Sequence, residues 1–248
     1  MIVLDSSILV AIIKFEEGWR QLISVLAAEE CAIGAPTLVE SRIWCTINLP
    51  ERRSFWLEDL LESEAVRSKL RQARHVHLAC ALRRPARWQP VLRDLKEGGA
   101  TISADFGWNP DISINQLVSI IRHCDFIFPN EHEARAITGA KTALNALEKL
   151  HEWVSTPVLK LGPRGSLLMA EGKLYRQPAL QLPLVDATGV GDAFNGGFLH
   201  AFLHGAGWDD CLRAGNICGS MAGTRPGGSE GLPGPQEYKR RMAEMRKS

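Results

Sequence analysis

Residues 186–192 form a glycine-rich loop that reads Asp186-Ala187-Thr188-Gly189-Val190-Gly191-Asp192 and runs directly into an apolar segment, residues 193–203. Glycine adopts backbone angles that side chains forbid, so Gly189 and Gly191 allow successive N–H groups to point into one anion-sized space. A helix that starts here adds the positive end of its dipole. The pattern therefore predicts a phosphate site at a helix start, where Asp192 can accept the proton of an attacking hydroxyl.

A purely structural explanation of the same loop is a glycine turn in which Asp192 only caps the helix. The following segment favours more than a turn. Residues 193–203 are apolar almost all round, which is typical of a core helix, yet they include Gly196 and Gly197. Each glycine costs about 1 kcal/mol relative to alanine in a helix interior. We therefore expect another part of the chain to pack very close to the first turns of this helix.

The loop and the helix after it resemble the C-terminal signature of the PfkB, or ribokinase-like, carbohydrate kinase family, which reads D-T-x-G-A-G-D before a helix of small residues. Ala187 and Val190 stand where the family has Thr and Ala, and we expect Val190 to crowd the loop. The resemblance implies a phosphotransferase in which Gly189, Val190 and Gly191 form the anion hole and Asp192 is the catalytic base.

Two further segments match the family in the correct order. Asn130-Glu131-His132-Glu133 matches its N-x-x-E, which implies that Asn130 and Glu133 organise magnesium and phosphate, Glu133 through a water molecule. Residues 160–165 resemble the strand and turn beneath the nucleotide, with Lys160 where relatives commonly have Thr. Taken alone, the first match also fits an ordinary helix start, and the second fits an ordinary β-turn.

The nucleotide side of the implied site extends along the C-terminal half of the chain. Residues 214–228 resemble the helix and loop that enclose the adenine, and residues 105–110 look like the family's D-x-N-x-R region without its Arg. The nucleotide contacts that the resemblance implies are Asn130, Glu133, Lys160, Gly162, Gly165, Asp186, Asn216 and Gly228. The implied cofactors are ATP and Mg²⁺, with a monovalent cation as a further expectation, and the implied partner is a small-molecule sugar or nucleoside substrate.

Short apolar runs alternate with helical-length segments in the middle of the chain. The expected strands are residues 75–79, 100–104, 126–128 and 158–161, the expected helices include residues 85–97 and 114–122, and residues 167–170 and 173–176 look like a hairpin. This alternation predicts an α/β fold with a parallel sheet covered on both faces. The resemblance makes it a ribokinase-like three-layer α/β/α fold with a mostly parallel central sheet. Ligands bind beyond the carboxyl ends of such strands, where we expect Asp105, Asn130 and Gly162 to line one rim.

The first part of the chain resembles a different family. Residues 1–43 resemble the start of a PIN-domain ribonuclease of the toxin type, in which Asp5 and Glu40 would help to bind magnesium. We expect this PIN-like fragment to pack on a PfkB-like kinase core at residues 44–248, so that the kinase fold is N-terminally truncated or replaced. Residues 1–15 can supply a strand in place of a lost one, since a buried strand needs mainly apolar, β-prone residues. The alternative for Asp5 and Glu40 is structural, as a cap after a buried strand and a charge on a helix face.

Composition argues against several classes of protein. A formal charge of +1 gives no overall basic field for nucleic acid, and no run approaches ~20 apolar residues, the length that crosses a bilayer. The six cysteines form no C-x-x-C and lie in expected core elements, as in a reduced cytosolic protein. We therefore expect a cytoplasmic protein without membrane or nucleic-acid partners. A homodimer is one expected state, because relatives often pair through lid strands and an exposed edge favours association.

Three functions stay open at this point. The first is an ATP- and magnesium-dependent phosphotransferase that acts on a hydroxyl of a sugar or sugar-like molecule. The second is a catalytically impaired, nucleotide-binding remnant of a sugar kinase with an interaction or structural role, because the family's sugar-binding opening is not found here. The third is a PIN-type ribonuclease that uses Asp5 and Glu40.

Overall fold

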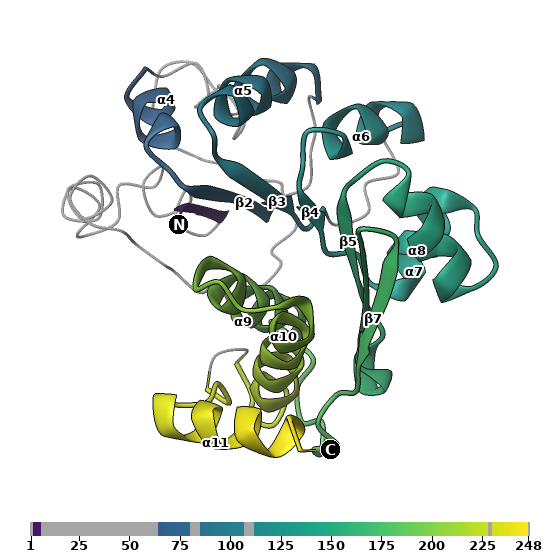
Figure 1. Ribbon diagram of the computed structural model, residues 1–248, viewed down its shortest axis with the longest axis vertical. Coiled ribbons are helices and arrows are strands. Elements are labelled where there is room, and N and C mark those ends of the chain that lie inside the picture. Colours follow the sequence, from purple (N-terminus) through teal and green to yellow (C-terminus); the bar gives the residue numbers. More distant parts are fainter. Residues whose placement is uncertain (1, 6–63, 80–84, 107–111, 228–229, 248) are drawn as a thin grey trace, which may run out of the picture. The chain divides into compact units, whose positions relative to one another are not determined.

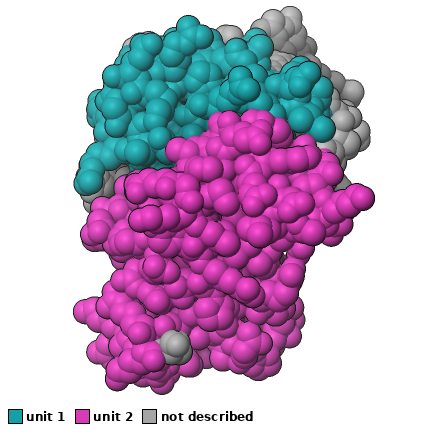
Figure 2. Space-filling view, turned by 45° about the vertical axis from the view of Figure 1, so that its right-hand side comes forward, with its two compact units in different colours: residues 1–33, 39–127 teal, residues 34–38, 128–248 magenta. Residues whose placement is uncertain are grey.

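The chain divides into two compact units, which are coloured separately in Figure 2. The computed structural model describes residues 2–5, 64–79, 85–106, 112–227 and 230–247. Unit 1 comprises residues 1–33 and 39–127, and unit 2 comprises residues 34–38 and 128–248. Each unit has its own strands and helices, and each is described by itself.

Unit 1 is built on four parallel strands (Figure 1). The strands are β1 (Ile2–Asp5), β2 (His75–Ala79), β3 (Thr101–Ala104) and β4 (Phe126–Ile127), and the helices are α4 (Glu64–Arg71), α5 (Pro85–Glu97) and α6 (Ile114–Ile121). Val76, Leu78 and Ile102 are fully buried in the two central strands. The predicted strands and helices of this part are confirmed, with β3, β4 and α6 each one residue shorter than expected.

The first strand of the chain joins this sheet. β1 pairs with β2 in parallel, with Ile2 opposite Val76 and Leu4 opposite Leu78. The prediction that the N-terminal segment supplies a parallel strand is therefore confirmed. The proposed boundary at residue 43 lies outside the described residues, as does Glu40, and the two-fragment organisation stays a prediction.

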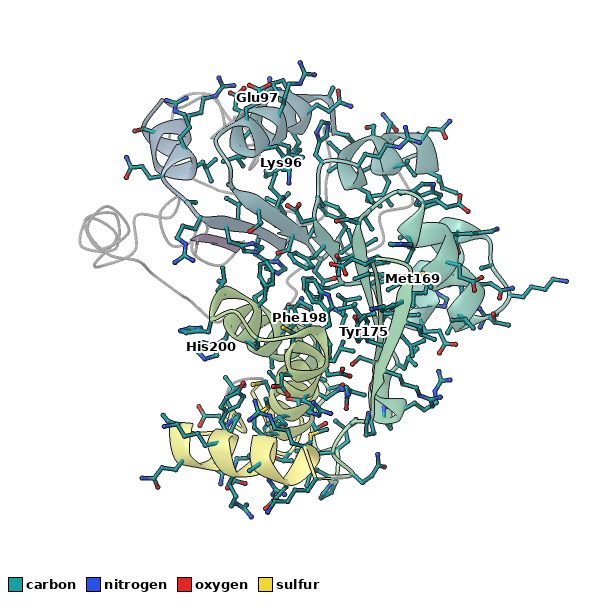
Figure 3. All side chains as sticks on the ribbon, viewed as in Figure 1. Lys96, Glu97, Met169, Tyr175, Phe198 and His200 are labelled. Atoms are coloured by element: carbon teal, nitrogen blue, oxygen red, sulfur yellow. The ribbon has the colours of Figure 1, made fainter. Side chains whose placement is uncertain are left out.

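The carboxylate of Asp125 links α5 to the sheet of unit 1. Lys96, which lies in the last turn of α5 and is labelled in Figure 3, forms an ion pair with Asp125 at 2.6 Å. The other oxygen of Asp125 accepts the backbone N–H of Ile102 at 2.7 Å. Trp88, Leu92 and other apolar residues of α5 are buried, so the helix is held by packing along its length and by a charged contact at its end.

Two buried histidines of β2 share a chain of hydrogen bonds with β3. His75 and His77 are 0% and 5% exposed. Thr101 Oγ1 donates to the Arg74 carbonyl at 3.3 Å and therefore accepts from His75 Nδ1 at 2.7 Å. His75 Nε2 then accepts the hydroxyl of Ser103 at 2.8 Å, and Ser103 accepts from His77 Nδ1 at 2.7 Å. Burial, followed by the neighbouring His77, lowers the pKa of His75 to about 3, so His75 is neutral in this chain.

Unit 2 combines an antiparallel hairpin sheet with five helices and a 3₁₀ turn in its described part. The elements are α7 (Glu131–Thr138), α8 (Ala143–His151), β5 (Thr156–Lys160), the 3₁₀ turn η1 (Gly162–Arg164), β6 (Ser166–Ala170), β7 (Lys173–Gln177), α9 (Val190–Leu203), α10 (Trp208–Ala222) and α11 (Pro235–Met245). β6 pairs antiparallel with both β5 and β7. The predicted hairpin is confirmed, and its turn residues Glu171 and Gly172 both have positive φ, as two-residue hairpin turns require.

Helices α9 and α10 pack side by side because three positions lack side chains (Figure 1). A methyl group on Gly197 would lie 2.5 Å from the Ala214 carbonyl oxygen, and one on Gly215 would lie 2.8 Å from the Phe194 ring. A methyl group on Gly219 would lie 3.2 Å from the Val190 carbonyl oxygen. The prediction of a close neighbour is confirmed at Gly197. It is wrong for Gly196, which is exposed and would have nothing within 4 Å of an added methyl.

The ring of Phe198, labelled in Figure 3, anchors α9 on its buried side. It is fully buried and meets the Phe128 ring edge-on, with centroids 5.2 Å apart and planes at 75°. Aromatic pairs in this arrangement add about 0.5–1.5 kcal/mol beyond their burial. The helix that carries Asp192 is thus fixed both by α10 and by the segment that precedes α7.

Candidate active site

The N-terminus of α9 is formed by a glycine in a left-handed conformation. Gly189 has φ 70° and ψ −1°, and it directly precedes Val190, the first residue of α9. Its carbonyl accepts the N–H of Ala193 at 2.8 Å, which closes the first turn. Asp192 is the acidic residue of that turn and not its cap, because Gly189 holds the cap position. The alternative in which Asp192 merely caps the helix is therefore wrong.

Val190 packs beside Gly223, which caps the end of α10 and has no side chain. A methyl group on Gly223 would lie 3.2 Å from Val190 Cγ2 and 2.8 Å from Leu184 Cδ1. Gly223 also accepts the backbone N–H groups of Val185 and Asp186, at 2.8 and 3.2 Å. The glycine at the end of α10 therefore makes room for the larger residue that replaces the family's Ala.

Asp186 links the glycine loop to the loop that follows α10. Its Oδ1 accepts the N–H of Thr188 at 2.9 Å, and its Oδ2 accepts the N–H of Gly227 at 3.0 Å. These hydrogen bonds, the one from Gly227 first, lower the pKa of the Asp186 carboxyl. The ionised carboxylate thus joins the glycine loop to the loop after α10, and its predicted role in contacting the nucleotide stays a prediction.

Lys160 reaches the first turn of α9 from the end of β5. Its backbone N–H donates to the Pro129 carbonyl at 3.0 Å, and it forms a parallel bridge with Asn130. Its Nζ lies 3.5 Å from Asn195 Oδ1, and a methyl group on Gly191 would lie 3.4 Å from the same Nζ. The ammonium group is therefore beside the glycine loop, a contact that the predicted place of Lys160 in the strand and turn beneath the nucleotide did not include.

Asn130 and Glu133 bond to each other across the first turn of α7. Asn130 Oδ1 accepts the N–H of Glu133 at 2.9 Å, and Glu133 Oε2 accepts the N–H of Asn130 at 2.8 Å. This is a reciprocal capping box, which matches the helix-start alternative for this motif. Glu131 in the same turn forms an ion pair with Arg164 of η1. A water-mediated role of Glu133 toward magnesium stays a prediction.

The remaining predicted nucleotide contacts differ in what surrounds them. Gly162 has φ 59° and open space around it, whereas a methyl group on Gly165 would lie 2.0 Å from the Gln177 carbonyl oxygen. Asn216 is 4% exposed, and its amide donates to Ser166 Oγ at 2.9 Å and to the Gln177 carbonyl at 3.1 Å. Gly165 and Asn216 therefore have clear structural tasks. Gly228 lies outside the described residues.

One residue of this site was not assigned from the sequence. Asn195 is 1% exposed on α9, and it stands four residues after Gly191, so the two lie on the same face of the helix. The signal was present in the sequence, since Asn195 is a polar residue in a segment that is otherwise apolar apart from two histidines. Its side-chain oxygen, Oδ1, lies 3.5 Å from Lys160 Nζ, which accounts for a polar residue at this buried position.

Two predicted positions belong to unit 1. Asp105 directly follows β3, and Asp5 is the last residue of β1. The expectation that Asp105 shares one rim with Asn130 and Gly162 stays a prediction. Within the described residues, no group of three His, Cys, Asp or Glu side chains could hold the metal ion that the ribonuclease hypothesis requires.

The loop, the helix start and the lysine together suit a phosphate group. First-turn N–H groups and the dipole of α9 favour an anion, and Lys160 adds a full positive charge. No cluster of three His, Cys, Asp or Glu side chains that could hold a metal ion occurs in the part of the chain that the structure describes. Magnesium at this site would therefore rely on nucleotide oxygens and water as well as on Glu133, as is usual for Mg²⁺ with phosphates.

Comparison with known families agrees with this geometry. The model of the family described as pfkB family carbohydrate kinase matches residues 47–235, well over half of the chain. The chain belongs to the pfkB family of carbohydrate kinases. Among curated members, it is 39% identical over 103 residues to the cytidine kinase of Thermococcus kodakarensis, covering 40% of this chain and 37% of that relative. It is 31% identical over 129 residues to the ribokinase of Haemophilus influenzae, covering 50% and 41%.

Solved structures of the pfkB family share the fold. Arabidopsis thaliana ribokinase, complexed with ribose and ATP, matches with a TM-score of 0.63 at 25% identity over 73% of this chain and 59% of that one. Aminoimidazole riboside kinase of Salmonella enterica, complexed with aminoimidazole riboside and an ATP analog, matches with a TM-score of 0.59 at 24% identity over 68% and 62%. The predicted α/β, ribokinase-like fold is confirmed. The chain spans less than half the length of the two curated relatives above.

The described helices are all too short or too polar to cross a membrane. A cytoplasmic location and a homodimeric state stay predictions.

Proposed function

We propose that this chain is an ATP-dependent phosphotransferase that acts on a hydroxyl of a sugar or sugar-like small molecule. The observation that carries the proposal is the start of α9, where the left-handed Gly189 opens the helix and Asp192 stands in its first turn. This arrangement offers backbone donors for a phosphoryl group and a carboxylate for a proton within four consecutive residues.

Each residue has a task in the proposed reaction. Asp192 accepts the proton of the acceptor hydroxyl, and the N–H groups from Gly189 to Gly191 stabilise charge on the transferred group. The residues proposed to contact the nucleotide are Lys160, Gly162, Gly165, Asp186, Asn216 and Gly228. Asn130 and Glu133 orient phosphate and, through water, Mg²⁺. Bound ATP and Mg²⁺ supply the transferable phosphoryl group and the charge that neutralises it.

The relatives support ATP as the phosphoryl donor and a sugar or nucleoside as the acceptor. Curated relatives include ribokinases, a cytidine kinase and an adenosine kinase, and one related structure is complexed with ribose and ATP. A sugar or the ribose of a nucleoside is therefore the acceptor class to test first.

A second candidate is a nucleotide-binding protein that has lost phosphoryl transfer. It is favoured by the bonds that occupy predicted site residues: Asn130 and Glu133 bond to each other, and the Asn216 amide binds Ser166 and Gln177. Such a protein would bind ATP and leave every acceptor unchanged.

Calorimetry with ATP and Mg²⁺, followed by ADP release over a panel of sugars and nucleosides, separates the two candidates. Acceptor-stimulated ADP release supports the phosphotransferase, and ATP binding without stimulation by any acceptor supports the second candidate. If the chain binds no ATP, both are wrong. A magnesium-dependent RNase assay of the native chain and Asp5→Ala tests the ribonuclease hypothesis in parallel, which fails if the two proteins behave alike.

A further inference from the structure

Lys160 occupies an unusual electrostatic position in unit 2. Its Nζ lies 3.5 Å from Asn195 Oδ1 and 3.4 Å from the position that a methyl group on Gly191 would take. Gly191 is the second residue of α9 and Asn195 stands one turn later. The lysine amine therefore lies against the first turn of this helix, which also carries Asp192.

A cation at this end of a helix works against the helix dipole. Positive side chains are favoured near helix C-termini and disfavoured near N-termini, by about 0.3–1 kcal/mol at exposed sites. Lys160 is nevertheless held there by the backbone of β5, whose last residue it is, and by the nearby oxygen of Asn195. Local conflicts of this kind occur where function requires them. An anion bound at the helix start would interact favourably with both the lysine and the dipole.

Gly191 leaves open space beside the amine of Lys160. Gly191 carries no Cβ, so nothing of its own stands between the backbone N–H groups of the turn and Lys160 Nζ. A methyl group there would already be in van der Waals contact with the amine. The same glycine thus exposes the backbone donors and leaves room for the ammonium group beside them.

We propose that Lys160 is a catalytic residue that contacts the transferred phosphoryl group, an inference that rests on the proposed phosphotransferase function. Asp192 takes the proton of the acceptor hydroxyl as the acceptor oxygen bonds to the γ-phosphorus. The bond from that phosphorus to the β–γ bridging oxygen breaks, and ADP leaves with the electron pair. Lys160 keeps its own protons throughout and donates an N–H to a non-bridging oxygen of the group in transfer, where negative charge is spread.

This role separates the chain from relatives that have Thr at the same position. A Thr hydroxyl is neutral and short, whereas Lys carries a charge on a four-carbon stem that extends from β5 to the first turn of α9. The lysine contact therefore acts on the charge of the phosphoryl group, and its loss should slow transfer more than it weakens ATP binding.

The test uses the full chain and four variants. Lys160→Met removes the charge and keeps the stem, Lys160→Thr installs the common family residue, and Lys160→Arg keeps the charge. Lys173→Met, at an exposed position of β7, is the matched control. The measurements are kcat, KM and Kd for ATP, and the Kd for ADP with aluminium fluoride, with thermal denaturation to confirm folding.

We expect Lys160→Met and Lys160→Thr to lower kcat by about 10²- to 10³-fold, as for loss of one transition-state donor. They should weaken ADP–aluminium fluoride by a similar factor and ATP by less than about tenfold. Lys160→Arg should retain more activity than either, and Lys173→Met should match the native chain. The inference is overturned if folded Lys160→Met keeps kcat within about threefold of the native value.

Binding of tripolyphosphate distinguishes failure of this inference from failure of the proposed function. If the native chain has no kinase activity but binds tripolyphosphate at least about tenfold more tightly than Lys160→Met, the function is wrong and the contact of Lys160 with phosphate stands. If an inactive native chain and Lys160→Met bind tripolyphosphate alike, or neither binds it, the lysine has no phosphate role and both proposals are wrong.

Discussion

Asp186 accepts a hydrogen bond from the backbone N–H of Gly227, at 3.0 Å, across a separation of 41 residues. The other carboxylate oxygen accepts the N–H of Thr188, so one side chain holds both the glycine loop and the loop that follows α10. The signature aspartate is therefore a brace between two loops. Its position fixes where Gly189 and the start of α9 lie relative to residues 223–227.

Replacement of Asp186 by Asn should loosen this brace. An amide has one acceptor oxygen and places its NH₂ against a backbone donor, so one of the two bonds is lost. We expect a lower melting temperature and a kcat reduced by roughly tenfold to a hundredfold, because small misplacements of reacting groups have effects of that size. Glu148→Gln, at an exposed position of α8, is the control for loss of one carboxylate charge. An unchanged kcat in Asp186→Asn would show that the brace does not position the site.

The same brace predicts a pH dependence of stability. The pKa of Asp186 is lowered in the folded chain by its hydrogen bonds from Gly227 and Thr188, so the folded state favours the ionised form. Its contribution is fully present above the unfolded pKa of about 3.9 and is lost as pH falls through the lower folded value. Chemical denaturation between pH 6 and pH 3, at intervals of about half a unit, should show a smaller acid-induced loss in Asp186→Asn than in the native chain.

Replacement of Asp192 by Asn should abolish phosphoryl transfer. The amide preserves size but cannot accept the hydroxyl proton, and loss of a general base costs about 10²- to 10⁴-fold. ATP affinity should change little, because the variant keeps the backbone donors of the glycine loop. Parallel calorimetry and ADP-release assays separate these effects. Turnover close to the native rate would exclude Asp192 as the base.

Two adjacent glycines of α9 should respond in opposite directions to the same substitution. Gly197→Ala places a methyl group 2.5 Å from the Ala214 carbonyl oxygen, and overpacking of this kind destabilises by about 1–3 kcal/mol. Gly196→Ala meets nothing within 4 Å and should stabilise the helix by about 0.5–1 kcal/mol. Urea denaturation of both variants measures the difference. Equal effects would contradict the close approach of α9 and α10.

The buried histidine chain gives a second pH effect, in unit 1. The pKa of His75 falls from 6.5 to about 3 on folding, so the unfolded chain binds more protons between these values. Stability should therefore decrease as pH falls from about 6.5 toward 3, by at most about 1.4 kcal/mol per pH unit. Denaturation of His75→Asn should show a shallower slope than the native chain, and His132→Asn, at an exposed position of α7, serves as the control. Identical slopes in all three proteins would remove His75 as the cause.

The strands outside the N-terminal segment, and helices such as α5 and α6, could be predicted because each has a strong local signal, whereas α4 and α8 were not predicted. Residues 85–97 and 75–79 coincide with α5 and β2, since apolar period and Pro or charged boundaries act over a few residues. The left-handed Gly189 was also foreseeable, because glycine adopts positive φ without steric cost, whereas Gly191 has no positive φ and is the second residue of α9. The N-terminal strand followed from its β-prone composition alone.

Other features depended on which distant residues meet. Asp186 was expected beside the nucleotide, yet both of its oxygens accept backbone N–H groups, one of them from a residue 41 positions away. Lys160 was placed in the strand and turn beneath the nucleotide, and its amine reaches α9 because its side chain spans from one element to another. The partners of long polar side chains depend on tertiary packing, so sequence spacing identified these residues as important without giving their contacts.

The capping, bracing and phosphate-facing residues of the proposed site all come from one continuous stretch, from Asn130 to Gly227. None of the hydrogen bonds that shape it, from the capping box to the Asp186 brace, draws on residues of unit 1. A genetic crossover anywhere before residue 128 would therefore exchange upstream sequence and pass on the whole stretch unbroken. Under the proposed function, such an exchange would leave the phosphate half of the site intact.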